Sequence, residues 1–151
     1  MDTIDDSAGA DAPQALLPGQ RLALGVARHL ADLGFAALPE FPTGEGGRMD
    51  LCALGPKGEV WCVEVKSCRA DYAADAKWAR YLAFCDRFFF AVPESFPAAI
   101  LPPDRGLILA DAWGAGVLRL GPETPLAPAR RRTITLRFAR LAAERLARLG
   151  A

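Results

Sequence analysis

The sequence has 151 residues, of which 52% are hydrophobic, and its 18 basic and 18 acidic side chains give a formal net charge of zero. This length suits one domain with a sizeable core. The chain opens with neither a basic leader nor a long apolar run, which argues against a signal peptide and a membrane span. Four cysteines without CxxC spacing argue against a zinc ribbon, so we expect reduced thiols in a cytosolic protein.

The first fourteen residues contain four aspartates and no basic side chain, which predicts a disordered acidic tail over 1–14. The rest of the chain, 15–151, carries a net charge of +4 and forms a single predicted domain. Apolar residues at helical spacing predict a first helix from Leu17 to Leu33. A short strand from Phe35 to Phe41 follows and carries Glu40.

Two apolar runs on either side of the turn Gly55-Pro56-Lys57-Gly58 predict a β-hairpin. Gly58 supplies the positive φ that closes a three-residue loop with a bulge. This loop length sets a register in which Asp50 lies opposite Glu64, with both carboxylates on one face of the sheet. Lys66 shares the face of Glu64 because side chains alternate along a strand. A two-residue loop would instead put the two carboxylates on opposite faces.

The pattern D…ExK formed by Asp50, Glu64 and Lys66 suggests metal-ion chemistry. Two carboxylates with Cβ atoms about 5 Å apart repel each other unless a cation lies between them. Mg²⁺ is usually held by one or two carboxylates together with waters and phosphate oxygens, and it can activate one of those waters. Lys66 could then orient the water or neutralise charge on a phosphate. The alternative is a simple ion pair between Lys66 and one of the acids at the sheet rim, since short patterns recur by chance.

A helical period begins at Asp71 and predicts a helix from Asp71 to Phe84, with Asp75 in its first turn. Trp78 and Tyr81 gather on one side of this helix. Core packing is the first interpretation of these two aromatics, and stacking on nucleic-acid bases is the second.

The dense apolar run from Arg87 to Val92 predicts a central strand, parallel to its neighbour because it follows a helix. Several prolines then mark a loop region. Two further short strands are predicted at Gly106 to Ala110 and Gly116 to Leu120.

A basic amphipathic helix is predicted for roughly Thr133 to Leu149. Together with the residues just before it, this segment holds seven arginines and one glutamate, a local charge of +6. Arginine binds phosphates in a bidentate way, so the segment is a candidate nucleic-acid surface, although a solvated helix face explains the charge equally well. The arginines assigned to nucleic-acid binding are Arg130, Arg131, Arg132, Arg137 and Arg140.

The order of elements, with an aspartate on the second strand and ExK on the third, resembles the αβββαβ core of the PD-(D/E)XK nuclease superfamily. The resemblance implies a restriction-endonuclease-like α/β fold, with a central mixed sheet flanked by helices and a C-terminal Arg-rich helix. Within the superfamily, about residues 20–95 look like the MmcB-like DNA-repair family. The residues that carry this likeness are Glu40-Phe41, Gly47-Arg48-Met49-Asp50, Val63-Glu64-Val65-Lys66-Ser67, Asp71-Tyr72, Asp75, Lys77-Trp78, Tyr81 and Phe84-Cys85-Asp86.

The resemblance also implies roles for the charged residues. Asp50 and Glu64 would be metal ligands, with the main-chain carbonyl of Val65 as a third, and the ion would be Mg²⁺ or Mn²⁺. Lys66 would be the catalytic lysine, and Glu40 an auxiliary acid near the site.

The function implied by the resemblance is a DNA-repair-associated nuclease that hydrolyses DNA phosphodiester bonds in the bacterial cytosol or nucleoid. The alternative is a non-catalytic DNA-binding or scaffold module of a repair complex that retains the nuclease fold. A lower-ranked interpretation is a protein-interaction domain with an inert ion pair. DNA is the expected partner, together with other repair proteins, and the fold allows a homodimer.

Overall fold

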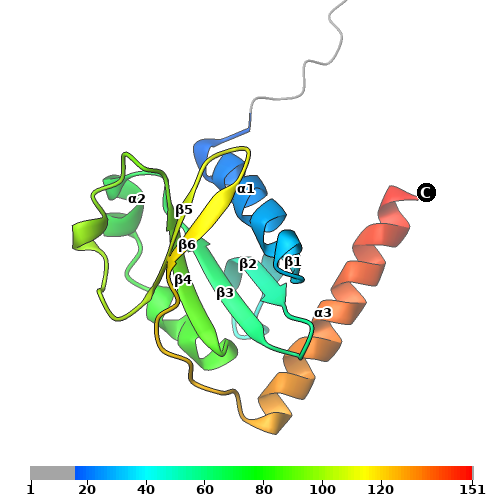
Figure 1. The fold of residues 1–151 in the computed structure, drawn as a ribbon. Helices are drawn as coiled ribbons and strands as arrows, with labels where there is room; N and C mark the ends of the chain where they lie inside the picture. Colours follow the sequence, from blue (N-terminus) through cyan, green and yellow to red (C-terminus); the bar gives the residue numbers. More distant parts are fainter. Residues whose placement is uncertain (1–15, 151) are drawn as a thin grey trace, which may run out of the picture.

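A computed structural model describes residues 16–150, so the acidic tail predicted for 1–14 lies outside the described part of the chain. Six strands form one sheet in the order of the sequence (Figure 1). The strands are β1 (Ala36–Pro42), β2 (Arg48–Leu54), β3 (Val60–Val65), β4 (Arg87–Val92), β5 (Gly106–Ala110) and β6 (Ala115–Arg119). The helices are α1 (Pro18–Asp32), α2 (Arg69–Ala74) and α3 (Pro128–Leu149), with 3-10 helices η1 (Trp78–Phe84) and η2 (Ala98–Ile100).

The sheet is mixed, as predicted. β3, β4 and β5 run parallel to one another, whereas β1 with β2, β2 with β3 and β5 with β6 pair antiparallel. The parallel pairing of β4 with β3 requires a crossover, which the segment containing α2 and η1 supplies. The restriction-endonuclease-like α/β class expected from the sequence is therefore confirmed.

Helices cover both faces of the sheet. On one face, α1 buries Leu22, Val26 and Leu30 against a cluster that includes Val63 of β3. The opposite face packs against η1 and α3, where Phe138 is one of the buried anchors. Because side chains alternate along β3, Val63 faces α1 and the adjacent positions face η1 and α3. The central strands are buried on both sides, which explains their nearly continuous apolar sequences.

The β2–β3 hairpin has the predicted three-residue loop. The Gly55 amide donates to the Glu59 carbonyl at 2.8 Å, and the Gly58 amide donates to the Gly55 carbonyl at 3.1 Å. Gly58 has a φ of +87°, the left-handed conformation that the bulge requires. Leu54 consequently pairs with Val60, in the register that the turn predicted.

The helix predicted from Asp71 to Phe84 is wrong as a continuous element. α2 ends at Ala74, Asp75 is extended with φ −96° and ψ 98°, and η1 begins at Trp78. The Asp75 carboxylate accepts a hydrogen bond from the Lys77 amide at 2.9 Å, and such local bonds compete with helix formation. The C-terminal helix also begins earlier than predicted, with Pro128 in its first turn, where a missing amide hydrogen costs nothing.

No helix within residues 16–150 combines the length and hydrophobicity needed to cross a lipid bilayer.

Candidate active site

Two carboxylates occupy the point where β2 and β3 stop pairing. The last paired residues there are Leu51 and Val63. In the next row, the Asp50 amide donates to Glu64 Oε1 at 3.0 Å, and the Val65 amide donates to Asp50 Oδ2 at 2.8 Å. Each carboxylate thus takes the place of a main-chain acceptor on the neighbouring strand. These bonds hold the two acids side by side, opposite each other as the hairpin register predicted.

The surroundings of this pair disfavour its negative charge. Burial raises the pKa of Glu64 well above its usual range, and the nearby charge of Asp50 raises it further. Burial also raises the pKa of Asp50, even though the Val65 amide opposes the shift. Ionising both half-buried Asp50 and buried Glu64 is therefore unfavourable, and a cation between them would relieve the cost.

Lys66, the lysine of the D…ExK pattern, does not pair with Asp50 or Glu64. Lys66 Nζ lies 2.7 Å from Asp75 Oδ2, and its side chain is only 9% exposed. The sequence allowed Lys66 to form an ion pair with Asp50 or Glu64 as the alternative to a metal site. In the structure, Lys66 pairs with Asp75. Burial raises the pKa of Asp75, but the hydrogen bond from Lys66 opposes it and the net shift is downward. Asp75 therefore fixes the position of the Lys66 side chain.

Asp75 is the site residue that sequence reasoning missed. The sequence predicts it in the first turn of a helix because Asp71 and Asp75 precede an apolar helical pattern. The signal that could have found it is its presence among the residues shared with the MmcB-like family.

The third acid near the site is Glu40, which lies on β1, the strand next to β2. The register of β1 with β2 puts Glu40 directly across from Asp50, so acids of three adjacent strands form one row. Glu40 has a φ of +52°, the one positive value at a non-glycine residue between 16 and 150, and such backbone typically costs about 1–3 kcal/mol. Its side chain pairs with Arg48 Nε at 2.7 Å, and Arg145 donates to its carbonyl at 2.8 Å. These two contacts hold the strained backbone of β1 at Glu40 in place.

A hollow of about 710 Å³ opens over this row, and we call it the Asp50 hollow. Asp50, Glu40, Arg48 and Arg80 line it, together with glycines of the loop before β2. Tyr81 orders the two arginines: its hydroxyl donates to the Arg48 carbonyl at 2.9 Å and lies 3.2 Å from the Arg80 guanidinium. A hollow that contains Asp50 and two arginines suits a phosphate group that bridges to a metal ion.

The Asp50 hollow continues toward α3. A hollow of about 340 Å³ shares Gly44 with it and is lined by Arg130 and Arg137. A third hollow of about 480 Å³ shares Arg137 and also contains Arg132 and Arg140. Four of the five arginines assigned to nucleic-acid binding therefore line surfaces that adjoin the site.

Arg131 differs from the other four arginines. Its guanidinium makes a bidentate contact with Asp86, 2.7 Å to each carboxylate oxygen, and donates to the Gly58 carbonyl at 2.9 Å. Its donors thus anchor α3 to the sheet.

Trp78 and Tyr81 also serve the core, as their first interpretation had it. The Trp78 ring lies 5.3 Å from Phe88 and 5.2 Å from Phe90, and Tyr81 is buried. Tyr81 therefore has no free face for base stacking, whereas Trp78 is half-buried.

The donor set of the site fits a hard divalent cation. Within residues 16–150 no group of three or more histidine, cysteine, aspartate or glutamate side chains is arranged to hold a metal ion. The candidate centre is therefore two carboxylates, Asp50 and Glu64, with the Val65 carbonyl adjacent in the chain. Mg²⁺ commonly binds through one or two carboxylates and keeps several waters, which matches such a small set.

Comparison with known proteins identifies the family of the chain. Residues 10–151 match the model of the family described as DNA repair protein MmcB-like. Among solved structures, the chain is similar to the SPO1766 protein of unknown function from Silicibacter pomeroyi, with 54% sequence identity and a TM-score of 0.88. That similarity covers 89% of this chain and 92% of the other. No curated protein matches the sequence. Because the family match spans nearly the whole chain, the protein belongs to the MmcB-like family of DNA repair proteins.

Proposed function

We propose that the protein is a Mg²⁺- or Mn²⁺-dependent nuclease that hydrolyses DNA phosphodiester bonds during repair. The observation that carries the proposal is the pair formed by half-buried Asp50 and buried Glu64, adjacent acids with raised pKa values and no cation of the chain bound to them within the described residues. Structural acids are normally neutralised by a partner from the same chain, so an unneutralised pair suggests an external ion.

The residues around the pair have separate roles in this proposal. Asp50, Glu64 and the Val65 carbonyl would hold the ion. When bound, Mg²⁺ lowers the pKa of a coordinated water and polarises a phosphoryl oxygen. Lys66, oriented by Asp75, would stabilise negative charge on the phosphate as the attacking water adds. Arg48 and Arg80 would bind the phosphate from the rim of the Asp50 hollow.

The decisive experiment is a cleavage assay on single-stranded, forked, nicked and fully paired DNA with Mg²⁺ or Mn²⁺. We expect Asp50→Asn and Lys66→Ala each to lower the cleavage rate at least about a hundredfold, the typical cost of losing one group that stabilises a transition state. The matched control is Asp104→Asn, because that acid is 70% exposed and pairs only loosely with its neighbour, Arg105. Cleavage that persists in both site variants would contradict the proposal.

A second candidate is a DNA-binding module without turnover. The hydrogen bonds of Asp50 and Glu64 favour it. Both carboxylates accept main-chain amides where β2 and β3 stop pairing, so both acids have a structural role. This candidate predicts binding without metal-dependent cleavage. Arg132→Gln and Arg140→Gln should each weaken binding and reduce its salt dependence by about one phosphate contact.

A further inference from the structure

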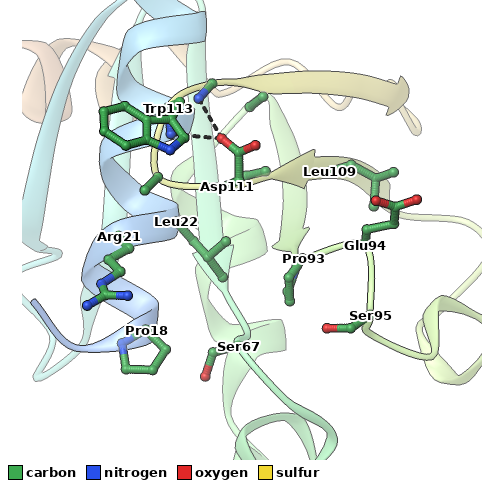
Figure 2. Close-up of a pocket in the computed structure, with 14 residues that line it drawn as sticks. Pro18, Arg21, Leu22, Ser67, Pro93, Glu94, Ser95, Leu109, Asp111 and Trp113 are labelled. Carbon is green, nitrogen blue, oxygen red and sulfur yellow. Dashed lines mark hydrogen bonds between the residues drawn. The ribbon is translucent and has the colours of Figure 1, made fainter.

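A larger hollow, of about 1060 Å³, opens at the edge of the sheet where the three parallel strands end (Figure 2). It is lined by Ser67 after β3, Glu94 after β4 and Asp111 after β5, and we call it the Trp113 hollow. Parallel strands present their carboxyl ends at one edge, so segments distant in the sequence meet there. Ser67 directly follows Lys66, which puts the Trp113 hollow beside the candidate active site without sharing its acids.

The side chain that distinguishes this hollow is Trp113. It is 80% exposed, the most exposed of the three tryptophans, and it projects from the turn between β5 and β6. The other two, Trp61 and Trp78, pack against phenylalanines of the core. The exposed indole leaves a large apolar face free to contact a ligand.

The turn that carries Trp113 is rigid. Asp111 Oδ1 accepts hydrogen bonds from the Trp113 amide at 2.7 Å and the Gly114 amide at 2.9 Å (Figure 2). Arg28 of α1 donates to the Ala112 carbonyl at 3.2 Å. α1 itself approaches closely, because a Cβ on Gly25 would meet the Asp111 carbonyl oxygen at 1.9 Å. The backbone of the turn is therefore held in place before any ligand arrives, which lowers the entropy cost of ordering it on binding.

The charges around the Trp113 hollow indicate what it can bind. Glu94 and Asp111 line its wall, and the Trp113 and Gly114 amides lower the pKa of Asp111, which keeps that carboxylate ionised. Acidic walls repel a phosphate but accept an uncharged heterocycle with amino groups. Arg21, exposed on α1 and also lining the hollow, can contact the phosphate attached to such a group (Figure 2).

We propose that the Trp113 hollow receives an unpaired nucleotide of the DNA substrate, with its base stacked on Trp113 and its backbone phosphate near Arg21. This assignment rests on the proposed function, because it names the class of DNA that the Asp50 site acts on. Stacking on a side chain needs a base whose face is free, and base stacking on aromatic residues is tolerant of sequence. The substrate is then DNA with a single-stranded arm next to the paired region, such as a fork or flap.

The test measures binding, not cleavage. Fluorescein-labelled forked DNA and a fully paired duplex of the same sequence are titrated with the full chain in EDTA, using fluorescence anisotropy. We expect forked DNA to bind wild type more tightly, and Trp113→Ala to weaken fork binding about tenfold while leaving duplex binding unchanged. Trp113→Phe should keep most of the affinity because phenylalanine also stacks. Leu118→Ala, a nearby surface residue that is 61% exposed, is the matched control and should change neither affinity.

A second readout reports stacking directly. The fluorescence of 2-aminopurine in the unpaired arm should fall when wild type binds and should stay unchanged with Trp113→Ala. Equal fork affinity in wild type and Trp113→Ala, or no preference of wild type for the fork, would overturn the inference. Failure of the proposed nuclease would look different: metal-dependent cleavage would be absent from every substrate while the Trp113-dependent fork preference remained.

Discussion

Asp86 and Glu64 are buried carboxylates in or beside the same central strands, each 4% exposed, yet their pKa values shift in opposite directions. Burial raises the pKa of both. At Asp86, hydrogen bonds from Arg131 and from the amides of Val60 and Leu126 more than offset burial, and the net shift is downward. At Glu64, the nearest strong charge is another carboxylate, and the shift is upward.

The difference separates a structural acid, Asp86, from an acid that we propose binds a metal ion, Glu64. Asp86 receives its cation from α3, which ties the C-terminal helix to the sheet. Asp50 and Glu64 receive none, because Lys66 contacts Asp75 instead. The first arrangement contributes stability, and the second is an electrostatic cost that binding of an external cation would remove.

The largest expected effect comes from Glu64→Gln. Cleavage should fall at least about a hundredfold, because the charge that holds the ion is lost. The unfolding temperature should stay the same or rise, since the substitution removes repulsion with Asp50 while Gln can still accept the Asp50 amide. Cleavage rates and thermal unfolding of the same samples check both points. A variant that cleaves normally, or that is strongly destabilised, would break the contrast with Asp86.

Asp86→Asn should show the reverse behaviour. It leaves the partly buried Arg131 without its carboxylate, and breaking such a pair typically costs about 3 kcal/mol of unfolding free energy. Urea denaturation measures the loss, with Asp104→Asn as a control expected to change stability by less than about 0.5 kcal/mol. Cleavage per folded molecule should be unchanged. A loss of cleavage without a loss of stability would show that Asp86 also belongs to the active site.

Metal binding should distinguish the two sites without any DNA present. A Mg²⁺ concentration one hundred times the dissociation constant should stabilise wild type by about 2.7 kcal/mol. Asp50→Asn should abolish the effect, whereas Asp86→Asn should retain it from a lower starting stability. Thermal unfolding with and without Mg²⁺, compared with EDTA, provides the measurement. An equal shift in Asp50→Asn would mean that the ion binds elsewhere.

The pH dependence of stability should have opposite signs at the two sites. This is the smallest of the expected effects. Asp86 has a lowered folded pKa, so its stabilisation is complete above the unfolded value of about 3.9 and is lost as the pH falls below it. Glu64 has a raised folded pKa, so it destabilises progressively as the pH rises from about 4.3 toward that folded value. The urea midpoint of Asp86→Asn should therefore fall less than that of wild type as the pH is lowered. The urea midpoint of Glu64→Gln should exceed that of wild type most at neutral pH. Parallel curves for all three proteins would remove the contrast.

Local chemistry explains which features could be predicted. The Gly55 to Gly58 turn determines its own bulge, and the bulge determines that Asp50 meets Glu64, so this part of the site followed from about seventeen residues. The mixed sheet followed from periodicity, and the family from a resemblance of these residues to known proteins. The break in the helix after Ala74 did not, because it involves the Asp75 carboxylate, which contacts Lys66 nine residues earlier as well as the adjacent Lys77 amide.

The arginines of α3 show the same limit. Arg131 and Arg132 are adjacent and chemically identical, yet one anchors the helix to Asp86 and the other is exposed to solvent. Only the rotation and position of α3 against the sheet separate them. Trp113 is a similar case, since its exposure depends on how the β5–β6 turn packs on α1.

By itself, the sequence determined the strand register of the hairpin and the two facing acids, since turn geometry and side-chain alternation act over a few residues. The tertiary structure decided which cation neutralises which acid. Lys66 joins Asp75 and Arg131 joins Asp86, contacts that bridge nine and 45 residues of sequence. Such pairings depend on where whole elements pack, and they leave Asp50 and Glu64 as the acids that an external ion would neutralise.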